Sequence, residues 1–493
     1  MTVPTDTHPL PTVVIGAGPI GLAAAAHLLE RGLDPLLLER GDQAGTAVRA
    51  WGHVRLFSRW SELVDPAARR LLVRVGWVEP EPSQYPTGAE WAELYLQPLA
   101  EALGDRVRYG QTVTGVARAG RDRVVDSGRE EQPFTVHLQD GAGRAERLSA
   151  LAVIDASGTW GRPNPLGSDG YPADGEHGPV IADHVSYRVP NLAGPDGADP
   201  GDGARYGGKR TAVVGSGHSA LTALVALATL AEEVPGTTAV WVLRRRAVDN
   251  AFGGGDADQL PARGALGVRA REAVAAGHIT VVTGFRTQAI EHVPDQTPSA
   301  GTLTLVSQDG ARIDGLDEVI GLTGFRPDHS ILSEVRLRLD TRLEAPAALA
   351  PLIDPNVHSC GTVYPHGATE LAHDEKDLYV VGMKSYGRAP TFLALTGYEQ
   401  VRSVAAALAG DHEAASRVEL TLPETGVCGG AGLFDDAAAQ GGGEGGGGCC
   451  GPTPAVDQRT LPVALVPTAR TVSQLIQIGV STGGAGACGP SGC

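Results

Sequence analysis

The sequence predicts an α/β fold built from two units, each a parallel sheet with layers packed on both of its faces. Two stretches carry this prediction. Residues 12–40 and residues 211–246 each read as a short apolar strand, a glycine-rich turn, a helix and a second strand, the order that produces parallel strand pairs. The chain of 493 residues, 42% of them hydrophobic, is long enough to bury two such cores.

The first unit opens with an apolar run at residues 13–15, which is typical of a buried parallel strand. Gly16, Gly18 and Gly21 follow in G-x-G-x-x-G spacing, and the second strand of the unit ends in Glu39. The first glycine makes the tight turn, the second lets the backbone approach a pyrophosphate, and the third lets the helix pack against the strand. The helix N-terminus attracts phosphate, and Glu39 can accept hydrogen bonds from a ribose. The alternative, a glycine-rich turn in an unrelated α/β domain, does not explain the complete unit.

The second unit repeats this order around Gly215, Gly217 and Ala220, with alanine an accepted third residue. Its second strand ends in three arginines, 244–246, where the first unit has an acid. Guanidinium groups bind phosphate through a bidentate fork, whereas a carboxylate would repel a 2′-phosphate. The two units therefore predict two Rossmann-like three-layer domains, the first for FAD and the second for NADPH. Alternatively, the arginines only solvate a loop in a chain whose basic residues are nearly all arginine.

Around these units the sequence predicts a helix at residues 87–103, opened by a capping pair of Thr87 and Glu90. Alternating segments predict a small antiparallel insertion that returns to the first parallel sheet, at residues 107–109, 112–116, 134–138 and 148–154. The predicted domains are the first part of the FAD-binding domain at 1–166, a connection at 167–208, the NADPH-binding domain at 209–322, the returning part of the FAD-binding domain at 323–422 and a flexible tail rich in glycine and cysteine at 423–493.

Composition limits the partners of this chain. The formal net charge of −17 argues against nucleic acid or an anionic membrane surface. The first residues show no signal-peptide pattern, and no run of about eighteen apolar residues could span a membrane. The fourteen histidines lack metal-ligand spacing, so no metal site is predicted. We expect a cytoplasmic protein that acts on a small molecule, and the sequence leaves open whether it forms a homodimer.

The chain resembles the two-dinucleotide-binding flavoproteins and, among them, the flavin-containing monooxygenase-like group. Residues 16–21 match its FAD fingerprint and residues 215–220 its NADPH fingerprint. Residues 156–158 and 322–328 resemble its linkers between domains, and residues 377–390, followed by a helix at 391–408, resemble its segment that returns to the flavin. The stretch GMKSYGRAPTFLALTGYEQVRS and a cysteine-bearing tail resemble, more narrowly, the flavin-binding monooxygenases of arsenic-resistance operons.

This resemblance implies an FAD- and NADPH-dependent monooxygenase that oxidises a soft, nucleophilic heteroatom, with a trivalent arsenical as the candidate substrate. NADPH would reduce the flavin, O₂ would add to it and one oxygen atom would pass to the substrate. The sequence identifies no catalytic residue, because the hallmark F-x-G-x-x-x-H-x-x-x-(Y/W) has only Asp183, His184 and Tyr187 as a partial counterpart. The Gly-Asp pair that closes many flavin sites is also missing after Val381.

The residues expected to hold the cofactors come from the two fingerprints and from the segments that resemble the linkers and the return. For FAD they are Gly16, Gly18, Pro19, Gly21, Glu39, Arg40, Ser157, Gly158, Gly382 and Pro390. For NADPH they are Gly215, Gly217, His218, Ser219, Ala220, Arg244 and Arg245.

Two rival functions depend on the cysteines. Disulfide reductases share this architecture, but they need two cysteines close to the flavin, and residues 1–422 contain only Cys360. The other five cysteines lie in the tail and include Cys428, Cys449 and Cys450, which are candidate thiols for a metalloid. The rivals are therefore an NADPH-dependent flavoprotein reductase that uses the tail thiols, and a thiol-tailed metalloid-binding protein.

Overall fold

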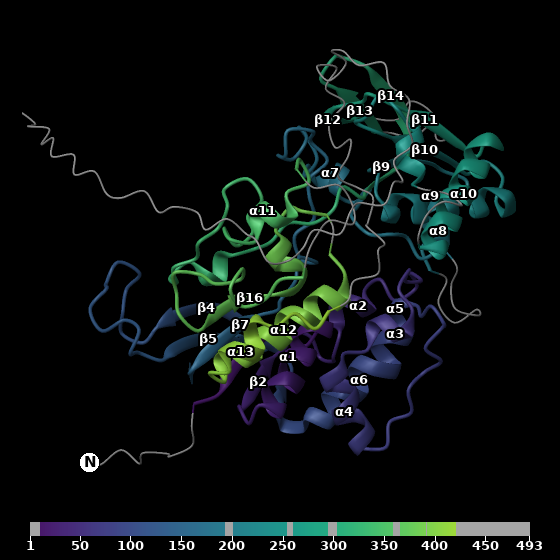
Figure 1. Cartoon of the computed structure of the whole chain (residues 1–493). Helices are drawn as coiled ribbons and strands as arrows, with labels where there is room; N and C mark the ends of the chain where they lie inside the picture. The colour runs from purple at the N-terminus through teal and green to yellow at the C-terminus, as the bar shows by residue number, and fades with distance from the viewer. Residues whose placement is uncertain are drawn as a thin grey trace, which may run out of the picture. The chain divides into compact units, whose positions relative to one another are not determined.

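The computed structural model describes residues 10–192, 201–253, 260–293, 303–357, 365–390 and 392–420 (Figure 1). These residues all belong to one unit of the chain, Met1–Asp436. The predicted tail and all six cysteines lie outside the described residues. The α/β prediction is confirmed, because two separate five-stranded sheets are parallel throughout.

The first sheet has the strand order β16-β7-β1-β2-β3. Its strands are β1 (Thr12–Ile15), β2 (Pro35–Leu38), β3 (Val107–Arg108), β7 (Ala152–Asp155) and β16 (Leu378–Val380). Side chains alternate between the two faces of the sheet: Val14 packs in the core formed with the helices, and Val13 packs in the core formed with an antiparallel sheet. The result is three layers.

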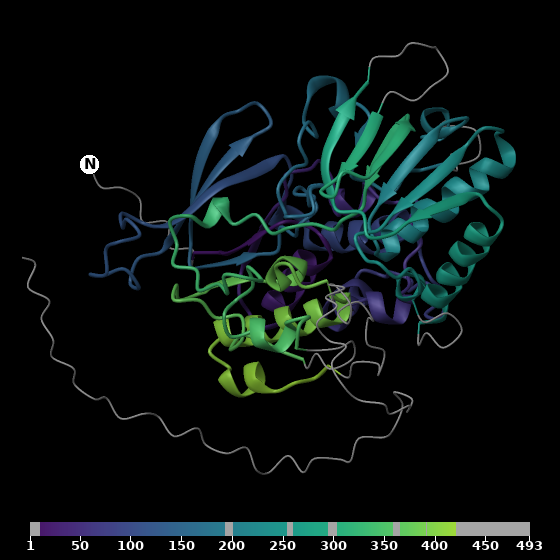
Figure 2. The ribbon, with the colours of Figure 1, turned by 90° about the horizontal axis from the view of Figure 1, so that it is seen from above.

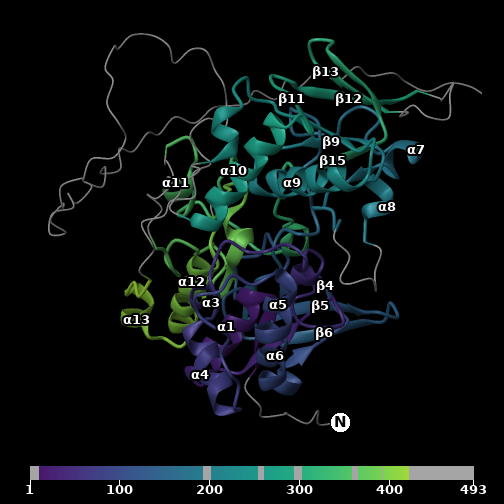
Figure 3. The same cartoon turned by 90° about the vertical axis from the view of Figure 1, so that its right-hand side faces the viewer.

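The helical layer on this sheet contains α1 (Pro19–Glu30), α4 (Pro66–Arg74), α6 (Gln97–Leu103) and α12 (Ala394–Leu408). Helix α12 lies beside α1 (Figures 1 and 3). It begins at Ala394, three residues later than predicted, and Thr391 lies outside the described residues. The helix predicted at 87–103 is present as α5 (Gly88–Trp91), a π-helical turn η1 (Ala92–Leu96) and α6.

The predicted capping pair opens this helix. The Thr87 N–H donates to Oε2 of Glu90 at 2.7 Å, and the Glu90 N–H donates to Oγ1 of Thr87 at 3.1 Å. Two backbone donors that the helix leaves unpaired are thereby satisfied.

The opposite face of the first sheet carries the antiparallel insertion, with the strand order β4-β5-β6. The segment 107–109, which was also predicted for this insertion, instead forms β3 of the parallel sheet, because it pairs with β2. These strands are β4 (Gln111–Arg118), β5 (Phe134–Asp140) and β6 (Ala145–Ala150). The segment predicted as one strand at 148–154 is divided at Leu151, where β6 ends and β7 returns to the parallel sheet.

The second sheet has the strand order β11-β10-β9-β15-β8. Its strands are β8 (Val185–Ser186), β9 (Arg210–Val214), β10 (Thr238–Val242), β11 (Ile279–Val282) and β15 (Glu318–Gly321). Helices α9 (His218–Glu233) and α10 (Pro261–Ala275) cover one face. Strand β8 comes from the stretch 167–208, which was predicted to be a connection, and it pairs with β15 at the sheet edge.

A second antiparallel sheet, which the sequence analysis did not predict, covers the other face of this sheet (Figure 2). It consists of β12 (Thr287–His292), β13 (Leu303–Ser307) and β14 (Arg312–Leu316). Ile290, Leu305 and Ile313 of these strands pack against Ala212 and Val240 of the parallel sheet.

The chain passes between the two sheets through a pair of segments that hydrogen-bond to one another. The Asn164 N–H donates to the carbonyl of Gly324, and the Arg326 N–H donates to that of Arg162, both at 2.9 Å. The rings of Trp160 and Phe325 stack with their centroids 5.0 Å apart. The second segment lies within the linker-like stretch 322–328, and the first follows shortly after the linker-like stretch 156–158.

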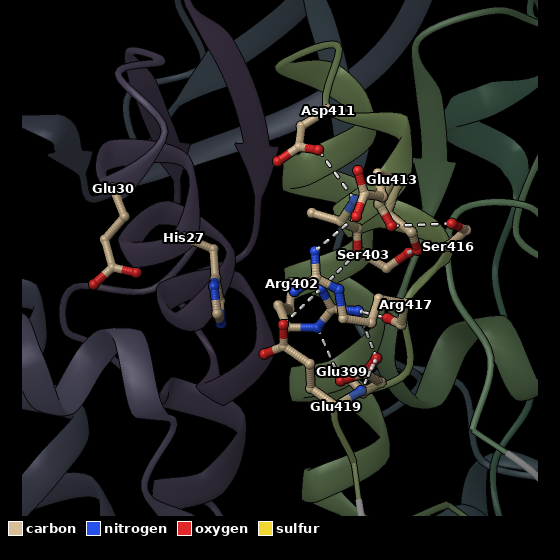
Figure 4. Close-up of polar contacts among 12 residues, drawn as sticks. His27, Glu30, Glu399, Arg402, Ser403, Asp411, Glu413, Ser416, Arg417 and Glu419 are labelled. Atoms are coloured by element: carbon tan, nitrogen blue, oxygen red, sulfur yellow. Dashed lines mark hydrogen bonds and ion pairs between the residues drawn. The ribbon is translucent and has the colours of Figure 1, made fainter.

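The last described residues are fixed to α12 by a cluster of polar contacts with α13 (His412–Ser416) (Figure 4). Arg402 binds Glu399 with two hydrogen bonds, of 3.0 and 2.7 Å, and donates to the carbonyl of Ala414 at 2.9 Å. The Ser403 hydroxyl donates to the carbonyl of Ala415 at 2.6 Å. None of the helices in the described ranges has both the length and the apolar character needed to cross a membrane.

Candidate dinucleotide sites

Two glycines of the first turn are required by the fold itself. Gly16 has a φ of 98°, in the region that favours glycine. A β-carbon added at Gly21 would lie 1.9 Å from the carbonyl oxygen of Gly16, so a larger residue would push helix α1 away from the turn. These two positions are therefore explained without a ligand.

Gly18 is different, because neither its backbone nor its packing calls for glycine. Its φ of −82° and ψ of −176° are extended values that any residue adopts. A β-carbon there would meet no atom of the described residues within 4 Å. Gly18 thus leaves open space directly in front of the N-terminus of α1.

Gly217 repeats this situation at the N-terminus of α9. Its φ is −89° and its ψ is 177°, and a β-carbon would again have no neighbour within 4 Å among the described residues. Gly215, in contrast, has a φ of 143°, and a β-carbon on it would lie 2.3 Å from the carbonyl oxygen of Leu322. In both units, then, the first glycine serves the fold and the second keeps space open.

The N-terminus of each helix that faces this space is suited to an anion. No side chain in the described part of the protein caps α1 or α9. The first N–H groups of a helix have no intrahelical partner, and the helix dipole adds partial positive charge there. Pro19, at the start of α1, has no N–H and holds its φ near the helical value. Phosphate binds readily at such a position.

The N-terminus of a second helix, α12, also lies at the end of the first sheet that carries the glycine turn. It adds partial positive charge there. Near the N-terminus of α12, a β-carbon on Gly397 would lie 2.5 Å from Cδ1 of Ile20 in the first turn of α1. At the other end, Nη1 of Arg31 lies 3.2 Å from Oδ2 of Asp411, just beyond α12. The two helices therefore run parallel, and both N-termini lie near the first glycine turn.

Glu39 is held over the first glycine turn by backbone donors. The Ala17 N–H donates to its Oε2 and the Gly41 N–H to its Oε1, each at 2.8 Å. Each carboxylate oxygen accepts more than one hydrogen bond, so Glu39 can still accept from ribose hydroxyls. Arg40, which was also expected at this site, is exposed at the surface.

The returning segment contributes an ion pair that the sequence analysis missed. Nζ of Lys384 lies 2.6 Å from Oδ2 of Asp155, and both side chains are at most 2% exposed. Ser157 adds hydrogen bonds to both partners, with its hydroxyl 3.1 Å from Nζ and 2.6 Å from Oδ1. Burial acts to raise the pKa of Asp155, but the ammonium of Lys384 outweighs it, and the pKa is lowered. The only sequence signal was that Lys384 is one of three lysines in an arginine-rich chain.

The other expected FAD residues take different positions. Gly382 has a φ of 70°, and its N–H donates to Oε1 of Gln400 at 2.7 Å, so this donor is already used. Gly158 has a φ of 70° and open space where a β-carbon would be, judged from the described residues. Pro390 is exposed.

In the second unit, Ala220 is fully buried against the sheet, as the third position of the fingerprint requires. The Trp241 ring nitrogen donates to the carbonyl of Gly215 at 2.8 Å and fixes the turn. His218 forms an edge-to-face ring contact with Phe57, with centroids 5.4 Å apart. Ser219 is exposed in the first turn of α9.

Arginines gather at the end of β10. Arg244 and Arg245 follow this strand, and Arg286, which the sequence analysis did not single out, approaches from the segment before β12. Arg244 is exposed at the surface, but partial desolvation of its guanidinium lowers its pKa, and the charges of Arg286 and Arg245 lower it further. Three neighbouring cations raise the local positive potential at this end of β10.

His184 is the partial counterpart of the monooxygenase hallmark. It lies at the end of the second sheet where β9 and β15 begin, whereas the glycine turn lies at the end where β9 stops. Its Nδ1 is 3.3 Å from Oε1 of Glu318, the first residue of β15, which also pairs with Arg205 at 2.7 Å. Glu318 lies beside Thr211 near the start of β9, whereas the glycine turn follows the end of that strand. The structure therefore assigns His184 to an ion-pair cluster away from the turn. Within the described ranges, no group of three or more His, Cys, Asp or Glu side chains could hold a metal ion.

Comparison with known proteins places this geometry in a functional context. Residues 12–81 match the family described as FAD dependent oxidoreductase. The indole-3-pyruvate monooxygenase YUCCA1 of Oryza sativa subsp. japonica is 29% identical over 212 residues, which are 42% of this chain and 43% of that protein. The match thus spans less than half the length of this curated relative.

Two solved structures have a similar fold. The bacillithiol disulfide reductase Bdr of Bacillus cereus is 19% identical with a TM-score of 0.58, over 81% of this chain and 99% of that one. DfoA, the cadaverine monooxygenase of desferrioxamine biosynthesis from Erwinia amylovora, solved with FAD, is 15% identical with a TM-score of 0.56, over 85% of this chain and 99% of that one. One fold therefore occurs in a reductase and in a monooxygenase.

The predictions of an oxidoreductase and of FAD as its cofactor are confirmed. The matched segment contains the first glycine turn, helix α1 and Glu39, so the sequence family and the local geometry point to the same site.

Proposed function

We propose that this chain is an FAD-dependent monooxygenase that takes its electrons from NADPH. The observation that carries the proposal is the pair Gly18 and Gly217, two glycines whose backbones and neighbours do not require glycine. Each keeps space open in front of a helix N-terminus, which is where a pyrophosphate would lie. Two such positions in one chain support a protein that holds two dinucleotides.

The residues of each site fit the nucleotide proposed for it. Gly18 and the first turn of α1 would hold the pyrophosphate of FAD, and Glu39 would accept the hydroxyls of its ribose. At the other site Gly217 would admit the pyrophosphate of NADPH, and Arg244 with Arg245 would hold its 2′-phosphate. Bound FAD supplies hydride acceptance and oxygen chemistry, and the protein supplies binding and orientation.

The cysteine content favours a monooxygenase over a disulfide reductase. A reductase of this architecture passes electrons from the flavin to a nearby cysteine pair, and residues 1–422 contain only Cys360, outside the described residues. A reductase would have to pass electrons from the flavin to the thiols of the tail instead. Oxygen consumption that matches NADPH oxidation, with oxygen found in the product, supports the monooxygenase.

Replacing both Arg244 and Arg245 with alanine is expected to raise KM for NADPH about ten- to a hundredfold and to leave KM for NADH nearly unchanged. A charge-assisted hydrogen bond to phosphate is worth about 1.5–3 kcal/mol, and NADH lacks the 2′-phosphate. Steady-state kinetics with both nucleotides measure the effect. Arg269→Ala, an exposed arginine on α10, is the control. Equal losses for NADPH and NADH would show that these arginines do not read the 2′-phosphate.

For the substrate we propose a soft, nucleophilic heteroatom, and specifically a trivalent arsenical. This proposal depends on the cysteines at 428, 449 and 450, which lie outside the described residues. Thiolates are soft ligands and select thiophilic species over hard cations. The tail would then collect the arsenical for oxidation at the flavin.

Removing the tail is expected to weaken arsenite binding without abolishing NADPH oxidation at saturating arsenite. The comparison is between the full chain and a chain ending at Pro423, with arsenite binding and arsenite-dependent NADPH oxidation measured on both. Equal affinity and equal turnover would exclude a role of the tail in substrate handling. Loss of turnover with every electron acceptor would instead support a reductase that uses the tail thiols.

A further inference from the structure

The buried pair of Asp155 and Lys384 lies where the strands of the first sheet end, beside the glycine turn at which the dinucleotide is proposed to bind. Asp155 ends β7, and Lys384 lies in the short helical turn η6 (Gly382–Tyr386) after β16. Asp155 is in register with Ile15, the residue before the glycine turn. A β-carbon on Gly16 would lie 3.0 Å from the carbonyl oxygen of Ala156, so this turn touches the residues that follow Asp155.

Stability alone does not account for this pair. Removing two charges from water costs several kcal/mol per ion, and a buried ion pair is often no more stabilising than apolar residues of similar size. Lys384 carries three N–H donors. Two acceptors are present in the described residues, Oδ2 of Asp155 and Oγ of Ser157. The third donor has no acceptor there.

The ammonium of Lys384 is buried, but it lies close to the surface. Ser157, which touches both members of the pair, is exposed, so the cluster lies directly beneath the surface. Burial lowers the pKa of His329, and the charge of Lys384 lowers it further. The exposed carboxylate of Asp328 is held mainly by Ser330. Among the described residues, Asp155 is the acidic residue that forms an ion pair with Lys384.

We propose that Lys384, oriented by Asp155 and Ser157, is a fixed cationic donor to the bound FAD, which strengthens FAD binding and favours its reduced form. The inference rests on the proposed function, since it requires FAD at the first glycine turn. Reduction adds negative charge to a flavin, and a fixed cation in a site shielded from water stabilises charge that develops beside it. Asp155 and Ser157 act as positioning residues, because they hold the lysine in one orientation.

The test is Lys384→Met, which keeps the length of the side chain and removes the charge and the donors. We expect the dissociation constant for oxidised FAD to rise about ten- to a hundredfold, as for the loss of a charge-assisted contact. Reduced FAD should lose more affinity than oxidised FAD. A tenfold difference between the two corresponds to a fall in reduction potential of about 30 mV, measured by equilibration with a reference dye.

Two further variants keep the test decisive. Lys384→Met leaves a buried carboxylate, so the double variant Asp155→Asn/Lys384→Met provides an uncharged site if the single variant does not fold. Lys384→Arg restores a cation and should recover part of the potential. Unchanged FAD affinity and an unchanged potential in Lys384→Met or in the double variant would overturn the inference. Failure of the unaltered protein to bind FAD would instead overturn the proposed function.

Discussion

Replacing Gly18 with valine is expected to abolish FAD binding while the protein stays folded. The extended backbone of Gly18 accommodates valine, and its β-carbon would enter space that is empty of described residues. That space is where the pyrophosphate must approach the backbone, so the same side chain excludes the cofactor. The measurement is the flavin content of the purified variant from its visible spectrum, with circular dichroism to verify folding.

Gly217→Val is the matched control, because Gly217 holds the same position in the second unit. It should keep a full complement of FAD and lose reduction of the flavin by NADPH. Gly21→Val should fail differently, since its β-carbon would collide with the turn and destabilise the fold. Stoichiometric FAD in Gly18→Val would refute the assignment of the first unit.

Glu375→Ala is expected to destabilise the protein by about 3–5 kcal/mol, the usual result of removing one partner from a buried ion pair. The carboxylate of Glu375 binds Arg118 at 2.8 Å and Arg129 at 2.6 Å, and all three side chains are at most 3% exposed. It also accepts the N–H of Arg336 at 3.1 Å. Without Glu375 two buried guanidinium groups lose their counter-charge, and the antiparallel sheet β4-β5-β6 loses one of its links to the returning segment.

Urea unfolding measures this loss. Glu146→Ala is the control, since the exposed pair of Glu146 and Arg108, 3.4 Å apart, should contribute no more than about 1 kcal/mol. Burial acts to raise the pKa of Glu375, and the arginines lower it by more. Its contribution to stability is therefore complete above the unfolded pKa of about 4.3 and is lost as pH falls through the lower folded value. A loss for Glu375→Ala equal to that of the control would contradict this account.

The local units of this fold could be predicted from the sequence because their signals lie within about thirty residues, the length of a βαβ unit. Both glycine turns follow a buried strand and open a helix, as expected. The carboxylate of Glu39 lies over the first turn, because the strand that ends beside it is parallel to β1. The capping pair at Thr87 was also readable, since its partners are three residues apart.

What the sequence did not predict depends on contacts between distant residues. Asp155 and Lys384 are separated by 229 positions, and the local pattern around one of them does not indicate the other. Arg286 interacts with Arg244, but α10 and β11 lie between the two residues in the sequence. Strand β8 is only two residues long and becomes a strand by pairing with β15, more than a hundred residues later. Periodicity within a segment carries no information about such pairings.

The proposal that NADPH reduces the bound flavin for reaction with oxygen is tested most directly by sequential-mixing stopped-flow spectroscopy. The FAD-loaded full chain is first mixed with NADPH without oxygen, and the reduced protein is then mixed with O₂. We predict that NADPH bleaches the absorbance of oxidised flavin faster than NADH does. With O₂, a separate spectral transient should precede the return of oxidised flavin. No bleaching by NADPH, or a direct return to oxidised flavin without a transient, would contradict the account.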